Sequence, residues 1–269
     1  MNESEYQMIT RTIKKHLDLD LDFYKPNQMK RRLGGFTNRV GATSVDEFCK
    51  MIATDADVRE LVMNFLTINV TEFFRDARHF DVLRSIVLPE ILKKNARPRI
   101  WSAGSSRGAE PYSVAMIIEE IAPGTKAQIV GTDIDTRMIA AARAGVPFPD
   151  AEAKNISDAL RKRFMEQREG EYFVAPEIRS KVTFKEQNLL TDVFDRNFDL
   201  IMCRNVVIYF SDEAKFELNY KFSNSLKTGG ILFIGGTETI LNPQNFGFER
   251  DSAAFYRKTN IPGQSRQAA

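Results

Sequence analysis

Cysteine and histidine are scarce in this sequence, which holds only Cys49, Cys203, His16 and His79. So few residues, so widely scattered, do not form the ligand pattern of a zinc or iron–sulfur site, and we expect no metal centre. The low cysteine count also indicates a reducing compartment, so we expect a cytoplasmic protein.

Long apolar runs and a strong net charge are also missing. No stretch approaches the roughly 18 apolar residues of a membrane span, and the N-terminus MNESEYQ is acidic where a signal peptide is basic. The 38 Lys and Arg nearly balance the 36 Asp and Glu, giving a net charge of +2. Because no overall basic field exists, we expect no nucleic-acid partner and no direct membrane insertion. The 43% hydrophobic content is that of an ordinary globular chain.

The first part of the chain carries helical signals and few strand signals. Ser44 and Glu47 form a capping-box pattern, and Thr54 with Asp57 offers a second helix start. Apolar residues follow each start at helical spacing. We predict a small all-α domain over residues 1–85.

After Pro98 the pattern changes to alternating strands and helices. Residues 99–103 predict a short strand that ends in the glycine loop 104–108, and a helical pattern follows. Residues 127–132 predict a second strand, ending at Asp133. This order opens a doubly wound α/β sheet, which we assign to a second domain over residues 86–260.

The later part of that domain continues the same alternation. Residues 198–203 predict a buried strand, residues 212–226 a helix that stops near two glycines, and residues 231–234 a further strand. The tail 261–269, rich in Pro, Gly, Ser and Gln, is predicted to be disordered.

An insertion interrupts the alternation at about residues 146–188. It contains two prolines near its start, a charged helix over 159–166, and strand-like pieces at 171–174 and 181–185. We interpret it as a small antiparallel β-subdomain.

The glycine loop indicates a ligand at the carboxyl ends of the strands. Gly104 and Gly108 permit close approach of the backbone, and Asp133 can accept hydrogen bonds from ribose hydroxyls. The loop is neither G-x-G-x-x-G nor a P-loop, so a nucleoside without pyrophosphate, such as S-adenosylmethionine, fits better than a dinucleotide or a nucleoside triphosphate. A structural tight turn explains the loop equally well.

Two further segments mix polar and apolar residues. Asn69-Val-Thr-Glu-Phe-Phe-Arg75 alone reads as a helix cap beside a surface arginine. Cys203-Arg-Asn-Val-Val-Ile-Tyr-Phe210 alone reads as a strand exit with a half-buried tyrosine.

A basic stretch lies over residues 25–45, which contain no acid. Its cations include Lys30, Arg31, Arg32 and Arg39. Composition alone favours a solvated helix face over a docking surface for an acidic partner.

Taken together, these segments resemble one family. NVTEFFR, WSAGSSRGAEPYSVAM, GTDID, NLL and CRNVVIYF, in this order, are similar to a CheR-type methyltransferase that methylates glutamates of chemoreceptors. The resemblance extends from Tyr24 to Tyr256 and includes MKRRL and the GGTE at Gly235–Glu238. It implies a small helical domain before a Rossmann-like S-adenosylmethionine-binding domain with a β-subdomain. The implied activity is methyl transfer to glutamate side chains on the cytoplasmic helical bundle of methyl-accepting chemotaxis receptors, with S-adenosylhomocysteine as the other product.

The resemblance also implies particular site residues. Arg75 and Tyr209 would lie nearest the chemistry. Cofactor contacts would fall on Asn69, Thr71, Arg75, Gly104, Glu110, Asp133, Asn188, Leu189, and Arg204 or Asn205. In this context, docking of Lys30, Arg31, Arg32 and Arg39 on an acidic receptor helix becomes the favoured interpretation of the basic stretch. We expect a monomer.

The chain departs from the family pattern in two places. Arg107 adds a charge to the glycine loop, while Ala109 removes one carboxylate and Glu110 keeps another, so we expect cofactor binding to survive with altered affinity. The subdomain is short between Glu166 and Lys181, which predicts a member that does not need a receptor's C-terminal pentapeptide.

Two other functions remain open. One is methylation of a small-molecule carboxylate, against which the basic N-terminal helices argue. The other is a non-catalytic sensor of an adenosyl ligand, which the changes at Arg107 and Ala109 favour. The retained residues oppose it: Arg75, Asp133, Asn205 and Tyr209.

Overall fold

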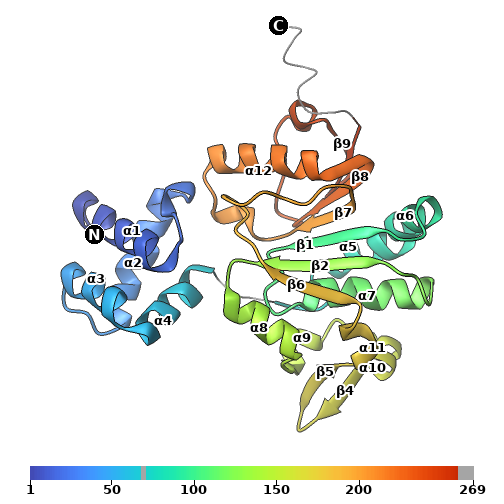
Figure 1. Cartoon of the computed structure of the whole chain (residues 1–269), viewed down its shortest axis with the longest axis horizontal. Coiled ribbons are helices and arrows are strands. Elements are labelled where there is room, and N and C mark those ends of the chain that lie inside the picture. Colours follow the sequence, from blue (N-terminus) through green and yellow to red (C-terminus); the bar gives the residue numbers. More distant parts are fainter. Residues whose placement is uncertain (68–70, 260–269) are drawn as a thin grey trace, which may run out of the picture. The chain divides into compact units, whose positions relative to one another are not determined.

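A computed structural model describes residues 1–67 and 71–259 of the chain, arranged in two units (Figure 1). By their internal contacts, residues 1–69 and 208–216 form the first unit, and residues 70–207 and 217–269 form the second. The end of the family-like segment 203–210, with Tyr209, therefore belongs to the first unit, although it lies far along the chain.

The first unit is helical. Its elements are α1 (Glu3–Leu17), η1 (Leu21–Phe23), α2 (Pro26–Arg39), α3 (Val45–Thr54), α4 (Ala56–Thr67), the end of η3 (Val207–Tyr209) and the start of α12 (Asp212–Ser225). The Ser44 hydroxyl caps α3 by accepting from the Glu47 amide at 3.1 Å. The Glu47 carboxylate instead accepts from Thr43, so only half of the predicted capping box forms. Apolar residues spaced along α1, α2 and α3 are fully buried and make the core of this unit.

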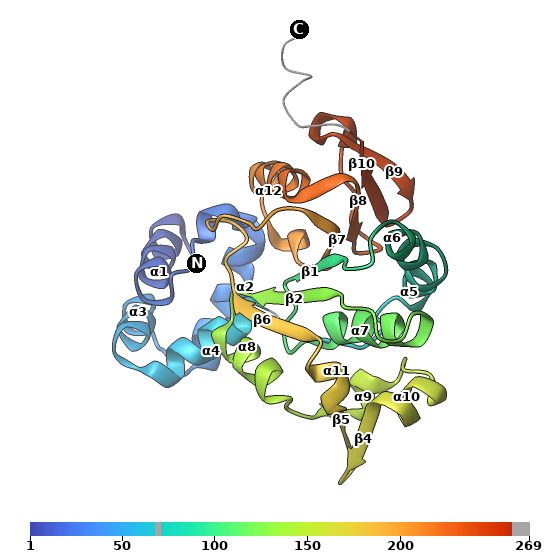
Figure 2. The ribbon, with the colours of Figure 1, turned by 45° about the vertical axis from the view of Figure 1, so that its right-hand side comes forward.

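A seven-stranded sheet forms the centre of the second unit (Figures 1 and 2). Its strands, in sheet order, are β6 (Val182–Glu186), β2 (Gln128–Asp133), β1 (Arg99–Ala103), β7 (Phe198–Cys203), β8 (Leu226–Ile234), β10 (Phe255–Lys258) and β9 (Phe248–Ser252). The first five run parallel, and β10 and β9 pair antiparallel at the end of the sheet.

Helices connect these strands and cover both faces of the sheet. They are α5 (Ala77–Val82), η2 (Leu83–Val87), α6 (Leu88–Lys94), α7 (Ala109–Ile121), α8 (Thr136–Ala144), the second part of α12 and η4 (Pro243–Phe246). On one face, Ile100 and Leu200 share a core with Val114 of α7. On the other face, the Trp101 ring packs 5.6 Å from Phe222 of α12. All six residues of β7 are buried, as a central strand covered on both faces requires.

The insertion after α8 is a separate small sheet in the order β3 (Phe148–Pro149), β5 (Glu171–Val174), β4 (Met165–Arg168). Three short helices accompany it: α9 (Asp150–Ala153), α10 (Asp158–Phe164) and α11 (Pro176–Arg179). These observations confirm the predicted doubly wound α/β fold with an inserted antiparallel sheet and a helical N-terminal unit.

Two segments lie elsewhere than the sequence analysis placed them. Residues 181–185 were assigned to the inserted sheet, but 182–186 form β6, the parallel edge strand beside β2. Residues 71–85 were assigned to the helical domain, but they belong to the second unit. The physical reason is burial, since Phe73, Phe80 and Leu83 are part of the core beneath the sheet.

Within the described ranges, no helix is both long and apolar enough to span a bilayer. The predicted disordered tail and the predicted cofactor residue Asn69 lie outside the described residues.

Candidate functional site

The carboxyl ends of the parallel strands bring the predicted cofactor residues together. The loop after β1 crosses to β2, where the amides of Gly104 and Ser105 both donate to the Thr132 carbonyl at 2.8 Å. Gly104 has φ +78°, and a Cβ at this position would lie 2.5 Å from Val206 Cγ2. The loop therefore needs glycine here for two reasons, its backbone conformation and its close approach to the β7 exit.

Asp133 ends β2 beneath this loop. Its carboxylate oxygens accept from the amides of Ser106, at 2.8 Å, and Asp135, at 3.0 Å. Burial raises the pKa of Asp133, although both backbone hydrogen bonds favour the ionised form. Each oxygen keeps capacity to accept from a further donor, such as a ribose hydroxyl.

Several buried polar atoms at these strand ends have no hydrogen-bond partner among the described residues. They are Ser105 Oγ, Ser106 Oγ, Asn205 Oδ1 and Glu238 Oε1. Buried polar groups are normally paired, so this group fits a polar ligand seated above the strand ends. The residues present thus suit a nucleoside-type cofactor such as S-adenosylmethionine.

Arg204 is the central cation of the site, directly after β7. Its guanidinium donates to Glu110 Oε2 at 3.2 Å, to Asp76 Oδ2 at 2.7 Å and to the carbonyl of Arg75 at 2.7 Å. The side chain is 2% exposed, and it lies over the Phe233 ring at 4.6 Å. The guanidinium is thus engaged with protein groups, so its function within the site is to join three segments.

Asn205 follows in a left-handed conformation, with φ +58°. Its amide donates to Glu238 Oε2 at 3.1 Å, and the Gly235 amide donates to the same oxygen at 2.6 Å. Burial raises the pKa of Glu238. The carboxylate fixes the backbone turn that presents Asn205.

Glu238 and Asp76 carry no role in the sequence analysis. Glu238 occurs there only within the GGTE segment, and Asp76 follows the NVTEFFR segment directly. One signal could have found Glu238: it is an acid four residues beyond the end of a parallel strand, where ligands of α/β sheets bind.

Arg75 lies in a tightly constrained loop before α5. The residues on either side, Phe74 and Asp76, have φ values of 50° and 61°, which side-chain-bearing residues rarely adopt. The Phe74 amide donates to Ser113 Oγ at 3.1 Å, which ties the loop to α7. The fold therefore constrains the backbone on both sides of Arg75, and the Arg75 carbonyl accepts from Arg204. Thr71, earlier in the same segment, is buried.

Asn188 and Leu189 begin the loop after β6. The Asn188 carboxamide oxygen accepts from the Leu190 amide at 3.0 Å, so it stabilises its own turn. Leu189 is buried, and its carbonyl accepts from Lys221 at 2.8 Å.

The two changed residues at the glycine loop, Arg107 and Ala109, are accommodated locally. Arg107 pairs with Glu152 of α9 at 2.5 Å, donates to the Pro147 carbonyl at 3.1 Å and lies over the Phe148 ring. The added charge is therefore neutralised at the base of the inserted sheet. Ala109 is fully buried in the first turn of α7.

Tyr209 belongs to the first unit, together with the predicted docking residues. Among these, Arg31 and Arg39 are exposed on α2. Lys30 pairs with Glu3 at 2.5 Å, and Arg32 is half-buried. Two of the four predicted docking cations thus have partners within their own unit.

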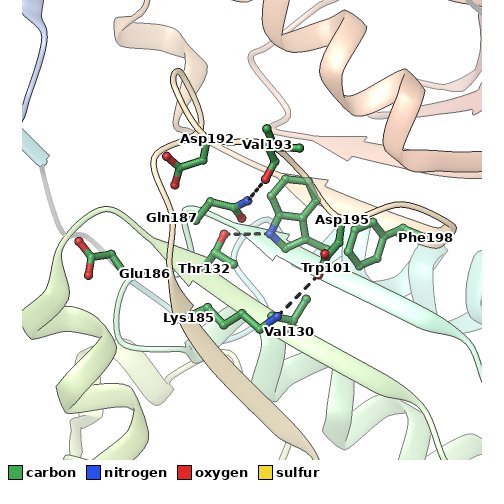
Figure 3. Close-up of a pocket in the computed structure, with 10 residues that line it drawn as sticks. All are labelled: Trp101, Val130, Thr132, Lys185, Glu186, Gln187, Asp192, Val193, Asp195 and Phe198. Carbon is green, nitrogen blue, oxygen red and sulfur yellow. Dashed lines mark hydrogen bonds and ion pairs between the residues drawn. The ribbon is translucent and has the colours of Figure 1, made fainter.

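A separate cleft of about 390 Å³ opens on the second unit beside the Trp101 ring (Figure 3). It is lined by Trp101, Val130, Thr132, Lys185, Glu186, Gln187, Asp192, Val193, Asp195 and Phe198. The Trp101 indole donates to Thr132 Oγ1 at 2.9 Å, and Gln187 donates to the Val193 carbonyl at 3.4 Å. No predicted site residue lines this cleft.

Comparisons with known proteins show the family of the chain. Residues 69–255 match the family model "CheR methyltransferase, SAM binding domain", and residues 4–67 match "CheR methyltransferase, all-alpha domain". A chemotaxis protein methyltransferase of Listeria monocytogenes is 38% identical over 258 residues, covering 96% of this chain and 98% of the relative. Chemotaxis protein methyltransferase 1 of Pseudomonas aeruginosa is 36% identical over 250 residues, covering 89% and 91%. The chain belongs to the CheR family of chemotaxis methyltransferases, which use S-adenosylmethionine as cofactor.

Proposed function

We propose that this enzyme methylates glutamate side chains on the cytoplasmic helical bundle of chemoreceptors. The observation that carries the proposal is the loop of Arg75, whose backbone carbonyl accepts from the Arg204 guanidinium and whose neighbours Phe74 and Asp76 both have positive φ values. A guanidinium in a rigid loop suits the orientation of an incoming carboxylate.

The chemistry requires little of the protein beyond placement. A glutamate has an ordinary pKa of about 4.3, so it is already an anionic nucleophile at neutral pH and needs no general base. S-adenosylmethionine supplies a methyl group on a sulfonium. The carboxylate oxygen forms the new bond to carbon while the carbon–sulfur bond breaks and its electron pair stays on sulfur, giving a methyl ester and S-adenosylhomocysteine.

In this proposal Arg75 and Tyr209 orient the attacking carboxylate, and fixed geometry of that kind supplies on the order of 7–11 kcal/mol. A contact that binds the carboxylate equally in the ground state and the transition state does not accelerate the reaction. In this proposal Arg75 therefore contributes by orienting the carboxylate, and not by binding it tightly. Asp133, Glu110, Asn205 and the loop of Gly104 hold the cofactor. Their support comes from the strand-end geometry and the unpartnered polar atoms there.

The receptor would dock on α2 through its two exposed arginines, Arg31 and Arg39. Attraction to an acidic helix weakens as salt rises. We expect charge reversal at both positions to raise the KM for receptor several-fold and to leave S-adenosylhomocysteine affinity unchanged. Wild-type KM in the reversed variant would refute the docking role.

Transfer of labelled methyl groups to a receptor cytoplasmic fragment tests the reaction class. Carboxyl methyl esters release volatile labelled methanol in mild base, and methylated amines do not. We expect methanol from the wild-type enzyme, a large reduction of the labelling rate in Arg75→Ala, a reduced but measurable rate in Tyr209→Phe, and normal activity in Arg78→Ala, which removes an exposed arginine of α5. Label that survives base, or an unreduced labelling rate in Arg75→Ala, would contradict the proposal.

A further inference from the structure

The segment that carries Tyr209 is held by the helical unit. The Lys25 amide donates to the Tyr209 carbonyl at 3.1 Å, and the Ser211 amide donates to the Phe23 carbonyl at 2.8 Å. These two hydrogen bonds fix the backbone at Tyr209 and directly after it. They tie it to the residues that lead into α2.

Aromatic packing strengthens the same attachment. Tyr24 and Phe210 form an isolated antiparallel bridge, and their rings meet edge-to-face with centroids 5.2 Å apart. Both side chains are buried. The backbone next to Tyr209 is therefore anchored by a pair of rings as well as by hydrogen bonds.

Arg32 supplies the contact to the Tyr209 ring itself. Its guanidinium carbon lies 5.7 Å from the Tyr209 ring centroid and 4.8 Å from the Phe65 ring centroid. The guanidinium also donates to the Phe65 carbonyl, and the Phe65 ring stacks on Phe36 at 4.2 Å. A planar cation attracts the face of an aromatic ring and so limits the movement of that ring. The Phe65 ring is already held by its stack on Phe36, so we expect the Arg32 contact to limit mainly the movement of the Tyr209 ring.

Arg32 differs in this from its neighbour on α2. Arg31 is exposed, whereas Arg32 is half-buried and its Nη1 is enclosed without a hydrogen-bond partner among the described residues. An acidic receptor helix can reach Arg31 directly, but Arg32 is already engaged with Phe65 and Tyr209.

We propose that Arg32 is a positioning residue for Tyr209, and not a docking residue. The inference rests on the proposed function, which gives Tyr209 its part in orienting the glutamate. One helix then serves two purposes: its exposed arginines bind the receptor, and its half-buried arginine holds the ring that meets the reacting carboxylate.

Adjacent substitutions separate the two roles. We expect Arg32→Gln to lower kcat for receptor methylation about tenfold, while KM for receptor and Kd for S-adenosylhomocysteine stay within twofold of wild type. We expect Arg31→Gln to raise KM with kcat unchanged. Lys50→Gln removes an exposed charge from α3 and is the matched control, with both constants expected at wild-type values. A raised KM in Arg32→Gln, with kcat intact, would overturn the proposal.

A double-mutant cycle tests whether Arg32 acts through Tyr209. In the Tyr209→Phe background, the Arg32→Gln change should cost less than twofold in kcat, because the hydroxyl it positions is gone. A full tenfold loss in that background would show a general structural effect and would refute the positioning role. Arg32→Lys, which keeps the charge but loses the planar fork, should give an intermediate kcat with an unchanged melting temperature.

Fluorine NMR tests the contact between Arg32 and Tyr209 without measuring activity, so it distinguishes a failure of this inference from a failure of the proposed function. The chain has seven tyrosines, so 3-fluorotyrosine labelling gives few signals, and Tyr209→Phe identifies the relevant one. Arg32→Gln should shift and narrow that signal, while Lys50→Gln should leave it in place. If Tyr209→Phe retained full activity, the catalytic role of Tyr209 would fail while the contact remained measurable. An unmoved signal in Arg32→Gln would refute the contact itself.

Discussion

Replacement of Arg204 by lysine tests whether one buried cation holds the site together. The guanidinium donates to Glu110, Asp76 and the Arg75 carbonyl at the same time, from a side chain that is 2% exposed. A lysine ammonium is a single point on a flexible stem, so it can satisfy about one of these acceptors. Two hydrogen bonds to a charged group are then lost.

The expected cost follows from these contacts. A hydrogen bond to a charged group contributes about 1.5–3 kcal/mol, so two lost bonds give roughly 3–6 kcal/mol. Asp76 is 43% exposed and regains water, which places the expected loss near the lower end, about 3 kcal/mol. For a unit of this size, about 3 kcal/mol lowers the melting temperature by roughly 6–12 °C.

Thermal unfolding followed by circular dichroism measures this loss, with Arg250→Lys as control. Arg250 is exposed and bonds only to backbone carbonyls of its own turn, so its replacement should change stability by less than about 0.5 kcal/mol. Arg204→Lys should also lose methyl-transfer activity more than S-adenosylhomocysteine affinity, because the Arg75 loop loses an anchor. A melting temperature within 2 °C of wild type, together with unchanged kcat, would refute the assignment of Arg204 as the link between these segments.

Three further substitutions test other parts of the second unit. Burial raises the pKa of Glu238, so the folded state binds the proton more tightly than the unfolded state, and stability falls as pH rises from the unfolded pKa through the folded one. Glu238→Gln cannot ionise and so does not lose stability in this way. Urea unfolding should therefore show the variant gaining stability relative to wild type between pH 4 and pH 8, and parallel pH profiles of the free energy of unfolding would contradict this. Asp199→Ala removes the carboxylate that accepts from Asn95, the Arg99 amide and the partly exposed Lys227, and should cost about 3 kcal/mol in the same assay. Arg107→Met removes the partner of Glu152, should cost about 1–2 kcal/mol, and should leave S-adenosylhomocysteine affinity by calorimetry within twofold of wild type.

The sequence predicted those elements whose signal lies within a few neighbouring residues. The glycine loop after residues 99–103, the acid at Asp133 and the buried strand 198–203 each have a signal within a few residues, and each is where it was predicted. The strand Met165–Arg168 was missed because three of its four residues are charged or polar, and its partner strand supplies the burial.

Long-range contacts account for what the sequence did not reveal. Arg204 meets Asp76 across 128 positions of the chain, and Asn205 meets Glu238 across 33. No periodicity links such pairs, so the sequence does not reveal that the Arg204 guanidinium bonds to Asp76 and Glu110. Its contact with the cofactor stays a prediction. The placement of Tyr209 in the helical unit is of the same kind, since the segment 208–216 joins that unit although the chain before and after the segment belongs to the second unit.

The division of the chain has a consequence for its modularity. The polypeptide passes from one unit to the other after residue 69, after residue 207 and after residue 216. Two domains joined by a single linker can be exchanged between relatives by one recombination event. Here, a chimaera that takes only the first 69 residues from a relative would pair foreign helices with the native segment 208–216. Recombination within this family must therefore preserve the match between the two pieces, and a swap should succeed only when both are transferred together.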